Sequence, residues 1–177
     1  MTKSYKELMT DITTFIFDVD GVLTNGNVTI FPNGELIRTM NTKDGFALKV
    51  AVDSGYHVCI ITGGNDTSVK KRLMGLGITD VYLGTHHKIN EFENYLKKYN
   101  LKASEVLYMG DDIPDLPVML KVKLAVCPKD ASPEIQNISQ YISHKKGGNG
   151  CVRDVIEQVL KVQDRWQHSY DISSDLS

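Results

Sequence analysis

The 177-residue sequence predicts an α/β fold, namely a doubly wound and mostly parallel sheet that carries one small β-hairpin. Three observations lead to this prediction. Short apolar runs alternate along the chain with segments of helical periodicity. The runs are continuous in apolar character, as in strands whose two faces are both covered by helices. One segment breaks the alternation and has the pattern of two short strands around a turn.

The strands and helices of the sheet follow one another in a regular order. We expect strands at residues 13–17, 58–61, 81–83, 106–109 and 124–126, with a weaker one at 141–143. Helices are expected between them at 45–54, 66–76, 88–99, 114–121 and 133–137, and a last one from 152 to about 167. Gly55 and Gly77 stand where glycine commonly follows the C-terminus of a helix.

The predicted hairpin covers residues 27–40. Its two arms, 27–31 and 35–40, flank the turn sequence Pro32-Asn33-Gly34. It interrupts the first connection from strand to helix, on the side where open α/β sheets bind ligands. We expect a single domain over residues 1–168 that includes this insertion, followed by a polar tail over residues 169–177.

The composition argues against several classes of protein. Twenty basic and 22 acidic residues give a formal net charge of −2, whereas nucleic-acid-binding domains are usually basic. No apolar run approaches the ~20 residues of a membrane span, and the N-terminus lacks the apolar stretch of a signal peptide. Cys59, Cys127 and Cys151 lack metal-ligand spacing and are expected to be buried thiols in a reducing compartment. We therefore expect a cytoplasmic protein that binds neither nucleic acid nor membrane.

Two acidic clusters each follow a predicted strand. Asp18 and Asp20 lie in FDVDG, where residues two apart in extended backbone share a face; Asp111, Asp112 and Asp115 follow the strand at 106–109. If both strands are parallel and central, their carboxyl ends bring these carboxylates into one crevice, where they repel one another unless a cation neutralises them. Oxygen ligands beside a substrate favour Mg²⁺. Taken singly, each cluster could instead be ordinary turn or helix-capping chemistry.

Two further side chains are expected at the same crevice. Thr62 ends the apolar run VCIIT and precedes Gly63 and Gly64, so its hydroxyl and the neighbouring amides could hold a phosphate oxygen. Lys88 begins a helix after VYLGTHH and could neutralise phosphate or pair with the carboxylates. Taken alone, Thr62 could equally belong to the cap of a helix, and Lys88 could be a solvated lysine in a first helical turn.

Four motifs stand in a fixed order along the chain: FDVDGVLT, IITGG, a lysine before a helix, and YMGDDIPD. In order and spacing they resemble the four motifs of the haloacid dehalogenase superfamily, whose Rossmann-like sheet agrees with the fold predicted above. Over about residues 10–165 the chain resembles the superfamily's phosphatases for 3-deoxy-D-manno-octulosonate 8-phosphate. This second likeness is carried by Asn41, Thr42, Lys43, Asp44, Gly45, Arg72, the run GDDIPDLPVM and residues 147–153.

The resemblance implies a magnesium-dependent phosphatase of lipopolysaccharide biosynthesis. Asp18 would attack phosphorus to give an aspartyl-phosphate, and Asp20 would protonate the leaving group and then deprotonate water. Asp18, the backbone carbonyl of Asp20, and Asp111 would bind Mg²⁺, with Asp112 and Asp115 as accessory residues. Thr62 and Lys88 would stabilise the phosphoryl oxygens. The residues expected to contact substrate are Asp20, Thr42, Lys43, Asp44, Gly63, Gly64, Arg72 and Lys88.

The resemblance also implies an assembly. Members have a minimal cap, which here is the hairpin, and form homotetramers in which the hairpins pack together and help to cover neighbouring sites. A two-stranded hairpin alone is marginal in water, so its apolar residues need a partner surface. These are Val28, Ile30, Phe31, Leu36 and Ile37. The glycine-rich segment 147–150 is expected to form a second, mobile cover.

Because of two departures from the family pattern, the sequence does not determine the sugar of the substrate. Many relatives carry a charged residue where this chain has Gly64, and the glycine-rich segment differs at Asn149 and Asp154. A phosphatase for nine-carbon sugar acids, such as a neuraminate or nonulosonate 9-phosphate, is therefore the alternative. A phospho-aspartate receiver module is disfavoured, because receivers phosphorylate an aspartate on the third strand and lack a residue like Asp20. A non-catalytic binding subunit is disfavoured because every catalytic position is intact.

Overall fold

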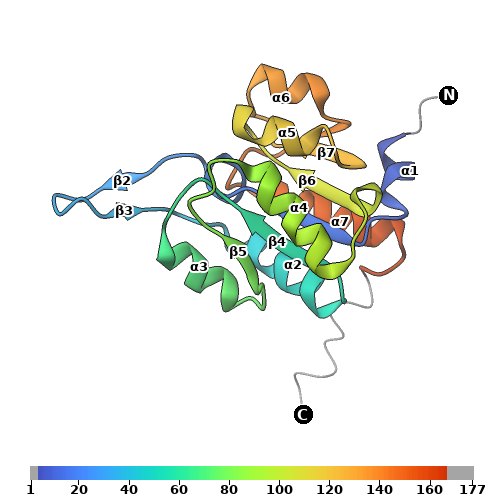
Figure 1. Cartoon of the computed structure of the whole chain (residues 1–177), viewed down its shortest axis with the longest axis horizontal. Helices are drawn as coiled ribbons and strands as arrows, with labels where there is room; N and C mark the ends of the chain where they lie inside the picture. The colour runs from blue at the N-terminus through green and yellow to red at the C-terminus, as the bar shows by residue number, and fades with distance from the viewer. Residues whose placement is uncertain (1–3, 167–177) are drawn as a thin grey trace, which may run out of the picture.

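The computed structural model describes residues 4–166, and its central feature is a six-stranded sheet (Figure 1). The strand order is β5-β4-β1-β6-β7-β8, and every neighbouring pair is parallel. The strands are β1 (Thr14–Phe17), β4 (His57–Ile61), β5 (Asp80–Tyr82), β6 (Val106–Met109), β7 (Leu124–Cys127) and β8 (Tyr141–Ile142). The prediction of a doubly wound parallel α/β fold is confirmed.

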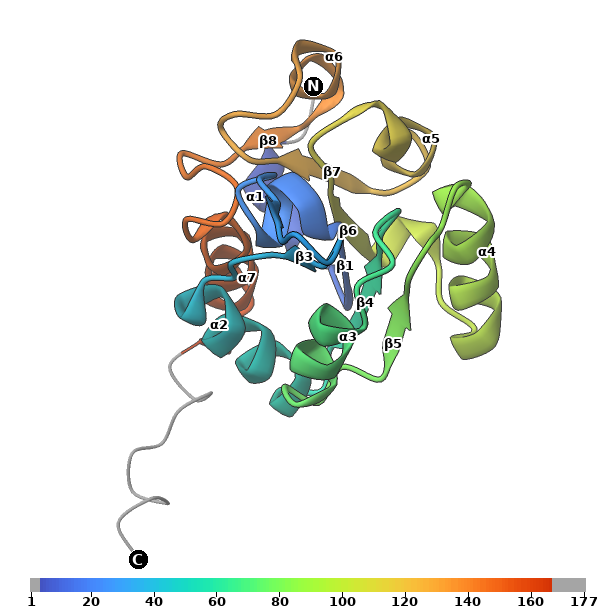
Figure 2. The ribbon, with the colours of Figure 1, turned by 90° about the vertical axis from the view of Figure 1, so that its left-hand side faces the viewer.

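Helices cover both faces of the sheet, as Figure 2 shows. Helices α1, α2, α3 and α7 contribute buried side chains to the core on one face, and α4, α5 and α6 contribute to the core on the other. Their bounds are α1 (Tyr5–Met9), α2 (Thr42–Asp53), α3 (Thr67–Met74), α4 (Lys88–Tyr99), α5 (Leu116–Met119), α6 (Pro133–Ile138) and α7 (Cys151–Val162).

Strand β1 shows why the apolar runs are continuous. All four of its residues are buried, and successive side chains point to opposite faces of the sheet. Phe15 and Phe17 belong to the core under α2 and α7, whereas Ile16 belongs to the core under α4 and α5. A strand with both faces covered has no solvent-facing position, so no polar alternation appears in the sequence.

The topology brings three strand ends together at one edge of the sheet. β1 lies between β4 and β6, and Phe17 is opposite both Ile60 and Met109. The chain passes from β1 to β4 and β5 on one side, and then crosses to β6 on the other side of β1. Such a switch point opens a crevice at the carboxyl ends of the strands, where ligands of α/β proteins bind.

The hairpin consists of β2 (Thr29–Ile30) and β3 (Leu36–Ile37), which pair antiparallel and project from the body of the protein (Figure 1). Gly34 closes its turn, with the Gly34 amide donating to the Phe31 carbonyl at 2.8 Å. The paired strands are shorter than the arms expected from the sequence. Their apolar side chains are exposed, and Ile30 is 71% accessible.

Some boundaries differ from the sequence prediction. Helix α7 ends at Val162 rather than near 167, because the backbone turns left-handed at Asp164 (φ 55°). Helix α1 was not expected, although Ser4 and Glu7 form a reciprocal capping box at its start. Gln167 and the predicted tail 169–177 lie outside the described residues. Within residues 4–166, no helix combines the length and apolar character that crossing a membrane requires.

Candidate active site

The first part of the site is the turn that follows β1. Asp18 is buried, and its backbone amide donates to the Met109 carbonyl of β6 at 3.1 Å. The chain then makes one wide turn, Val19–Leu23, which carries Asp20 into the same pocket as Asp18. Gly21 has a φ of +85°, and an added Cβ would lie 2.0 Å from Oδ2 of Asp111. Glycine is therefore required here both by the backbone and by the closeness of the second acidic cluster.

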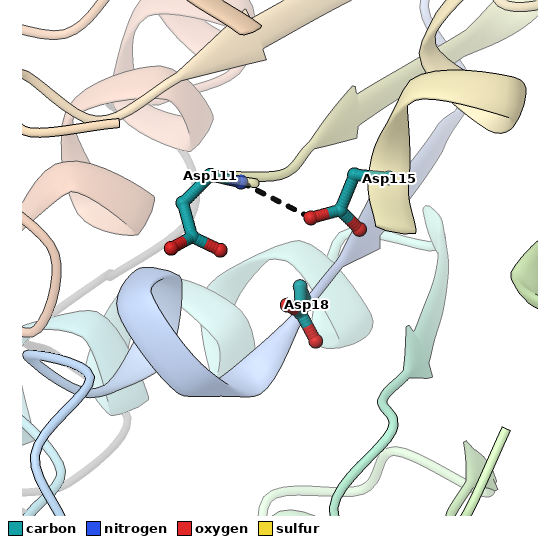
Figure 3. Close-up of side chains that lie close together, drawn as sticks. All are labelled: Asp18, Asp111 and Asp115. Atoms are coloured by element: carbon teal, nitrogen blue, oxygen red, sulfur yellow. Dashed lines mark hydrogen bonds between the residues drawn. The ribbon is translucent and has the colours of Figure 1, made fainter. Parts of the chain in front are cut away.

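The second acidic cluster follows β6 and is built as a capped turn. Asp112 accepts from the Ile113 amide at 2.9 Å, and Asp115 accepts from the Asp111 amide at 3.1 Å. A short 3₁₀ turn, Ile113–Asp115, leads into α5. The helix-capping interpretation thus holds for Asp112 and Asp115. It does not account for Asp111, whose carboxylate projects toward Asp18 (Figure 3).

Three carboxylates converge where these two turns meet. Asp18, Asp111 and Asp115 each place an oxygen within 4.8 Å of the others. Figure 3 shows them approaching from the end of β1, from the loop after β6 and from the turn before α5. Two elements far apart in the sequence thus build one acidic centre, as parallel central strands were expected to do.

Lys88 supplies the positive charge at this centre. It is the first residue of α4 and is 4% exposed, and its Nζ lies 2.9 Å from Asp18 Oδ2 and 2.7 Å from Asp115 Oδ1. The buried Tyr108 hydroxyl donates to the same Asp115 oxygen at 2.6 Å. Since the other Asp115 oxygen accepts from backbone amides, both oxygens of Asp115 are already occupied.

One lysine does not balance three carboxylates. Burial, followed by the charges of Asp18 and Asp115, raises the pKa of Asp111 to about 7. Burial and the charge of Asp115 also raise the pKa of Asp18, although Lys88 opposes this shift. A divalent cation would relieve the repulsion and favour the ionised carboxylates. Each Asp115 oxygen accepts two hydrogen bonds, whereas each Asp18 oxygen has one partner, the Val19 amide at 2.7 Å or Lys88 at 2.9 Å. Asp18 and Asp111 therefore have lone pairs to offer to such an ion, and Asp115 fits better as the residue that holds Lys88.

The third part of the site follows β4. Thr62 is 3% exposed, and its Oγ1 accepts from the Gly64 amide at 3.2 Å. This region and the acidic centre line one pocket of about 420 Å³, a size typical of small-molecule sites. Its lining residues are Asp18, Asp20, Gly26, Thr62, Gly63, Gly64, Thr85, His86, Lys88, Asp111, Asp112, Pro114 and Asp115.

Four residues expected to contact substrate lie outside this pocket. Asp44 is buried and accepts from the amides of Gly150 and Arg153, at 3.2 and 2.8 Å, so it caps the N-terminus of α7. Lys43 lines a separate pocket of about 470 Å³ beside α7, and Arg72 lines a groove at the base of the hairpin. Thr42 is exposed at the start of α2.

Sequence reasoning missed four residues that line the pocket, namely Gly26, Thr85, His86 and Pro114, and two residues that hold its carboxylates. Tyr108 lies within an apolar strand, where a buried hydroxyl needs a partner, and that need was the available signal. Arg38 follows β3 and forms a bidentate ion pair with Asp20, with Nε–Oδ1 at 2.7 Å and Nη2–Oδ2 at 3.0 Å. No local sequence pattern predicts this contact, because the two residues meet only where the hairpin returns to the body of the protein.

The glycine-rich segment 147–150 is hydrogen-bonded to the body of the protein. The Gly148 amide donates to the Val22 carbonyl at 2.9 Å, and the Gly147 amide donates to Asp130 at 2.9 Å. A Cβ on Gly147 would lie 1.9 Å from the Gly21 carbonyl oxygen. This segment thus packs against the turn that follows Asp18, and its mobility as a cover stays a prediction.

The fold and the site together define a class. A parallel doubly wound sheet that presents DxD at the end of its first strand, a threonine, a helix-initial lysine and a late acidic cluster has the architecture of the haloacid dehalogenase-like hydrolases. The model of the family described as haloacid dehalogenase-like hydrolase matches residues 73–155.

Individual relatives identify a narrower family within these hydrolases. The chain is 38% identical over 155 residues to a 3-deoxy-D-manno-octulosonate 8-phosphate phosphatase of Salmonella typhi, covering 88% of this chain and 82% of that one. The same-named phosphatase of Moraxella catarrhalis, solved with magnesium, phosphate and a KDO molecule, has a TM-score of 0.91 at 30% identity, with 97% of each chain covered. The cobalt-bound Haemophilus influenzae phosphatase has a TM-score of 0.88 at 27% identity, covering 96% of this chain and 99% of that one. The chain belongs to the 3-deoxy-D-manno-octulosonate 8-phosphate phosphatase family.

Proposed function

We propose that this protein is a magnesium-dependent phosphatase that hydrolyses 3-deoxy-D-manno-octulosonate 8-phosphate through a phospho-aspartate at Asp18. The observation that carries the proposal is the acidic centre, where Asp18, Asp111 and Asp115 each place an oxygen within 4.8 Å of the others and Lys88 lies 2.9 Å from Asp18 (Figure 3). The sugar follows from the family to which the chain belongs and from the solved relative that contains KDO. The reaction releases the free sugar acid for lipopolysaccharide biosynthesis.

In the first step, a carboxylate oxygen of Asp18 attacks phosphorus as the bond from phosphorus to the sugar oxygen breaks. Asp20, which lines the same pocket, donates a proton to the departing oxygen. Lys88 and the Thr62–Gly64 segment surround the phosphoryl oxygens, where positive charge and amide donors stabilise the transition state.

In the second step, water attacks the phosphorus of the aspartyl-phosphate while Asp20 accepts its proton. The bond from Asp18 to phosphorus breaks, and inorganic phosphate leaves. Asp18, Asp111 and the backbone carbonyl of Asp20 would hold Mg²⁺, which supplies the charge that neutralises the phosphoryl group. The carboxylate oxygens of the site are the donor type that this ion prefers, and two relatives were solved with divalent metals.

The assembly we propose is a homotetramer in the cytoplasm. Five apolar side chains of the hairpin are exposed in the single chain, namely Val28, Ile30, Phe31, Leu36 and Ile37. A contiguous exposed apolar patch of this kind marks an interaction surface. The three cysteines are free and buried, as suits a reducing compartment.

The main alternative is a phosphatase for nine-carbon sugar acids. Thr42, Lys43 and Arg72 lie outside the acidic pocket, so the contacts that would distinguish the sugars remain a prediction. A receiver module would have no use for Asp20 in the pocket, and it would keep its phosphoryl group after treatment with a small phosphodonor. A non-catalytic binding subunit would release no phosphate at all.

A phosphate-release assay tests the proposal directly. Wild-type protein with Mg²⁺ is compared on eight-carbon 8-phosphate and nine-carbon 9-phosphate sugar acids, and Asp18→Asn is the inactive control. We expect the highest kcat/KM on the eight-carbon acid. A higher kcat/KM on the nine-carbon acid would transfer the assignment to the alternative. A stable phospho-protein without turnover would favour the receiver.

A further inference from the structure

Arg38 links the hairpin to the acidic pocket. It follows β3 directly, and its guanidinium binds both oxygens of Asp20 in a parallel fork at 2.7 and 3.0 Å. A third nitrogen, Nη1, lies 3.3 Å from Asp66, the residue that caps α3. The Arg38 side chain is 8% exposed and that of Asp20 is 34% exposed, so the ion pair is partly buried. Bidentate arginine–carboxylate pairs fix geometry more strictly than a point charge does.

The space for this contact depends on Gly64. A Cβ on Gly64 would lie 3.3 Å from Nη2 of Arg38 and 3.4 Å from Oδ2 of Asp20. A larger side chain at position 64 would therefore press on both partners of the ion pair. Gly64 lines the acidic pocket together with Asp20, whereas Arg38 is absent from that lining and lines a small neighbouring space with Thr62, Gly64 and Asp66. Arg38 therefore reaches the acidic pocket through its contact with Asp20.

We propose that Arg38 is the positioning residue that orients Asp20 for hydrolysis of the aspartyl-phosphate, and that the absence of a side chain at Gly64 leaves room for it. This inference rests on the proposed function. The fork fixes the direction in which the Asp20 carboxylate points, and the second step isolates this effect because its only proton transfer is from water to Asp20. The water loses its proton to Asp20, its oxygen bonds to phosphorus, and the bond to Asp18 breaks.

A substrate with a good leaving group separates the two steps. p-Nitrophenolate leaves without being protonated, so the first step on p-nitrophenyl phosphate does not need Asp20 as an acid. For Arg38→Ala we expect kcat to fall by about 10–100-fold while kcat/KM, which reports the first step, stays within about threefold. Rapid mixing should give a burst of about one p-nitrophenolate per site, and acid-quenched protein should carry phosphate on Asp18.

Two other variants and one control make the test more specific. Arg38→Lys keeps the charge and loses the fork, so its kcat should lie between those of wild type and Arg38→Ala. Asp20→Asn should show the same burst with a slower second phase. Lys49→Ala removes an exposed ion pair with Asp53, far from the pocket, and should leave both constants unchanged.

Any other outcome would contradict the inference, and each of these outcomes can be distinguished from the rest. An equal fall of kcat and kcat/KM together with a lower unfolding midpoint would mean that Arg38 only supports the fold. A fall of kcat/KM on the sugar-acid phosphate alone would mean that Arg38 binds the substrate carboxylate. An unchanged kcat would leave Arg38 no role. If wild-type protein with Mg²⁺ cleaves no phosphomonoester, the proposed function fails and this inference fails with it.

Discussion

Lys88 and Asp115 form a buried ion pair, with Nζ 2.7 Å from Oδ1 and the two side chains 3% and 1% exposed. Because Asp115 also binds the Tyr108 hydroxyl and a backbone amide, its position is fixed, and it fixes the lysine in turn. Within residues 4–166, Lys88 is the one cationic side chain that pairs with any of the three converging carboxylates. Substitutions at this lysine should therefore affect both stability and turnover.

For Lys88→Met we expect a loss of about 2–4 kcal/mol in the free energy of unfolding at pH 8, because two buried carboxylates lose their counter-charge. The loss should be smaller at pH 5.5, where protonation of Asp18, whose pKa is already raised by burial, removes part of the repulsion. Turnover should fall at least about 10³-fold. Urea unfolding at both pH values measures the first effect. Lys49→Met, in an exposed pair, should change stability by less than about 0.5 kcal/mol and serves as the control.

Asp111→Asn should stabilise the metal-free protein. Burial and two neighbouring carboxylates raise the folded pKa of Asp111 to about 7, from an unfolded value of about 3.9. A group with a raised folded pKa contributes stability that is present below the unfolded pKa and is lost as the pH rises through the folded pKa. Metal-free wild type should therefore lose stability between about pH 4 and pH 7, and Asp111→Asn should lose on the order of 1–2 kcal/mol less.

With magnesium bound, wild type rather than Asp111→Asn should be the more stable protein. Added Mg²⁺ should raise the melting temperature of wild type at pH 8 and leave that of Asp111→Asn nearly unchanged, because a ligand that binds only the folded state stabilises it. Activity should vanish on chelation and return with Mg²⁺, whereas Ca²⁺ should substitute poorly because of its looser coordination. Full activity in exhaustively chelated protein would contradict the metal assignment, and an equal Mg²⁺ shift in both proteins would remove Asp111 from the ligand set.

Asp18→Asn should abolish turnover while leaving the fold intact. The substitution keeps the shape of the side chain and removes the nucleophilic oxygen, and Lys88 keeps its partner Asp115. Phosphate release and the unfolding midpoint are measured on the same sample, with Mg²⁺ in excess. Phosphate release within tenfold of wild type would show that Asp18 is not the nucleophile.

Gly147→Ala tests the packing of segment 147–150 against the turn after Asp18. The added Cβ would lie 1.9 Å from the Gly21 carbonyl oxygen, so the turn that carries Asp20 must shift. We expect a loss of about 2–3 kcal/mol in stability and a lower kcat per folded molecule. Gly34→Ala is the control, because its added Cβ meets no atom within 4 Å and costs only the strain of a positive φ, about 1 kcal/mol. A mobile segment would accept Gly147→Ala without loss.

The sequence predicted the sheet and the carboxylates, threonine and lysine of the acidic pocket because these follow from local patterns. A continuous apolar run identifies a strand buried on both faces, and a polar residue at its end must lie at the edge of a parallel sheet. Asp18, Thr62 and Asp111 were found in this way, and the register of β1 with β4 and β6 places them together.

Arg38 and Asp44 show where such reasoning stops. Arg38 reaches Asp20 only because the hairpin returns to the body beside the pocket, and that path depends on tertiary packing. Asp44 lies in a motif that resembles a substrate-binding segment, yet it caps α7, which is more than 100 residues away along the chain. A capping partner so distant in sequence leaves no pattern near either residue.

The last prediction concerns the exposed apolar surface of the hairpin. Ile30 is 71% exposed in the single chain, and Phe31, Leu36 and Ile37 are each more than 40% exposed. If hairpins pack together at the centre of a tetramer, Ile30→Asp places a charge in a desolvated interface and should dissociate it. Light scattering at assay concentration should fall from about four times 19.8 kDa to about one.

Kinetic measurements on Ile30→Asp then show whether the hairpin only assembles the tetramer or also covers the pocket of a neighbouring chain. Because Asp18, Lys88 and Asp111 come from one chain, dissociated Ile30→Asp should keep its kcat on p-nitrophenyl phosphate. Its KM for the sugar-acid phosphate should rise if a neighbouring hairpin covers the pocket. Glu35→Ala, which alters a charged residue of the same hairpin, should leave the assembly intact. A wild-type monomer with full activity on the sugar-acid phosphate would disprove the tetramer. An unchanged KM in dissociated Ile30→Asp would mean that the hairpin assembles the tetramer but does not cover a neighbouring pocket.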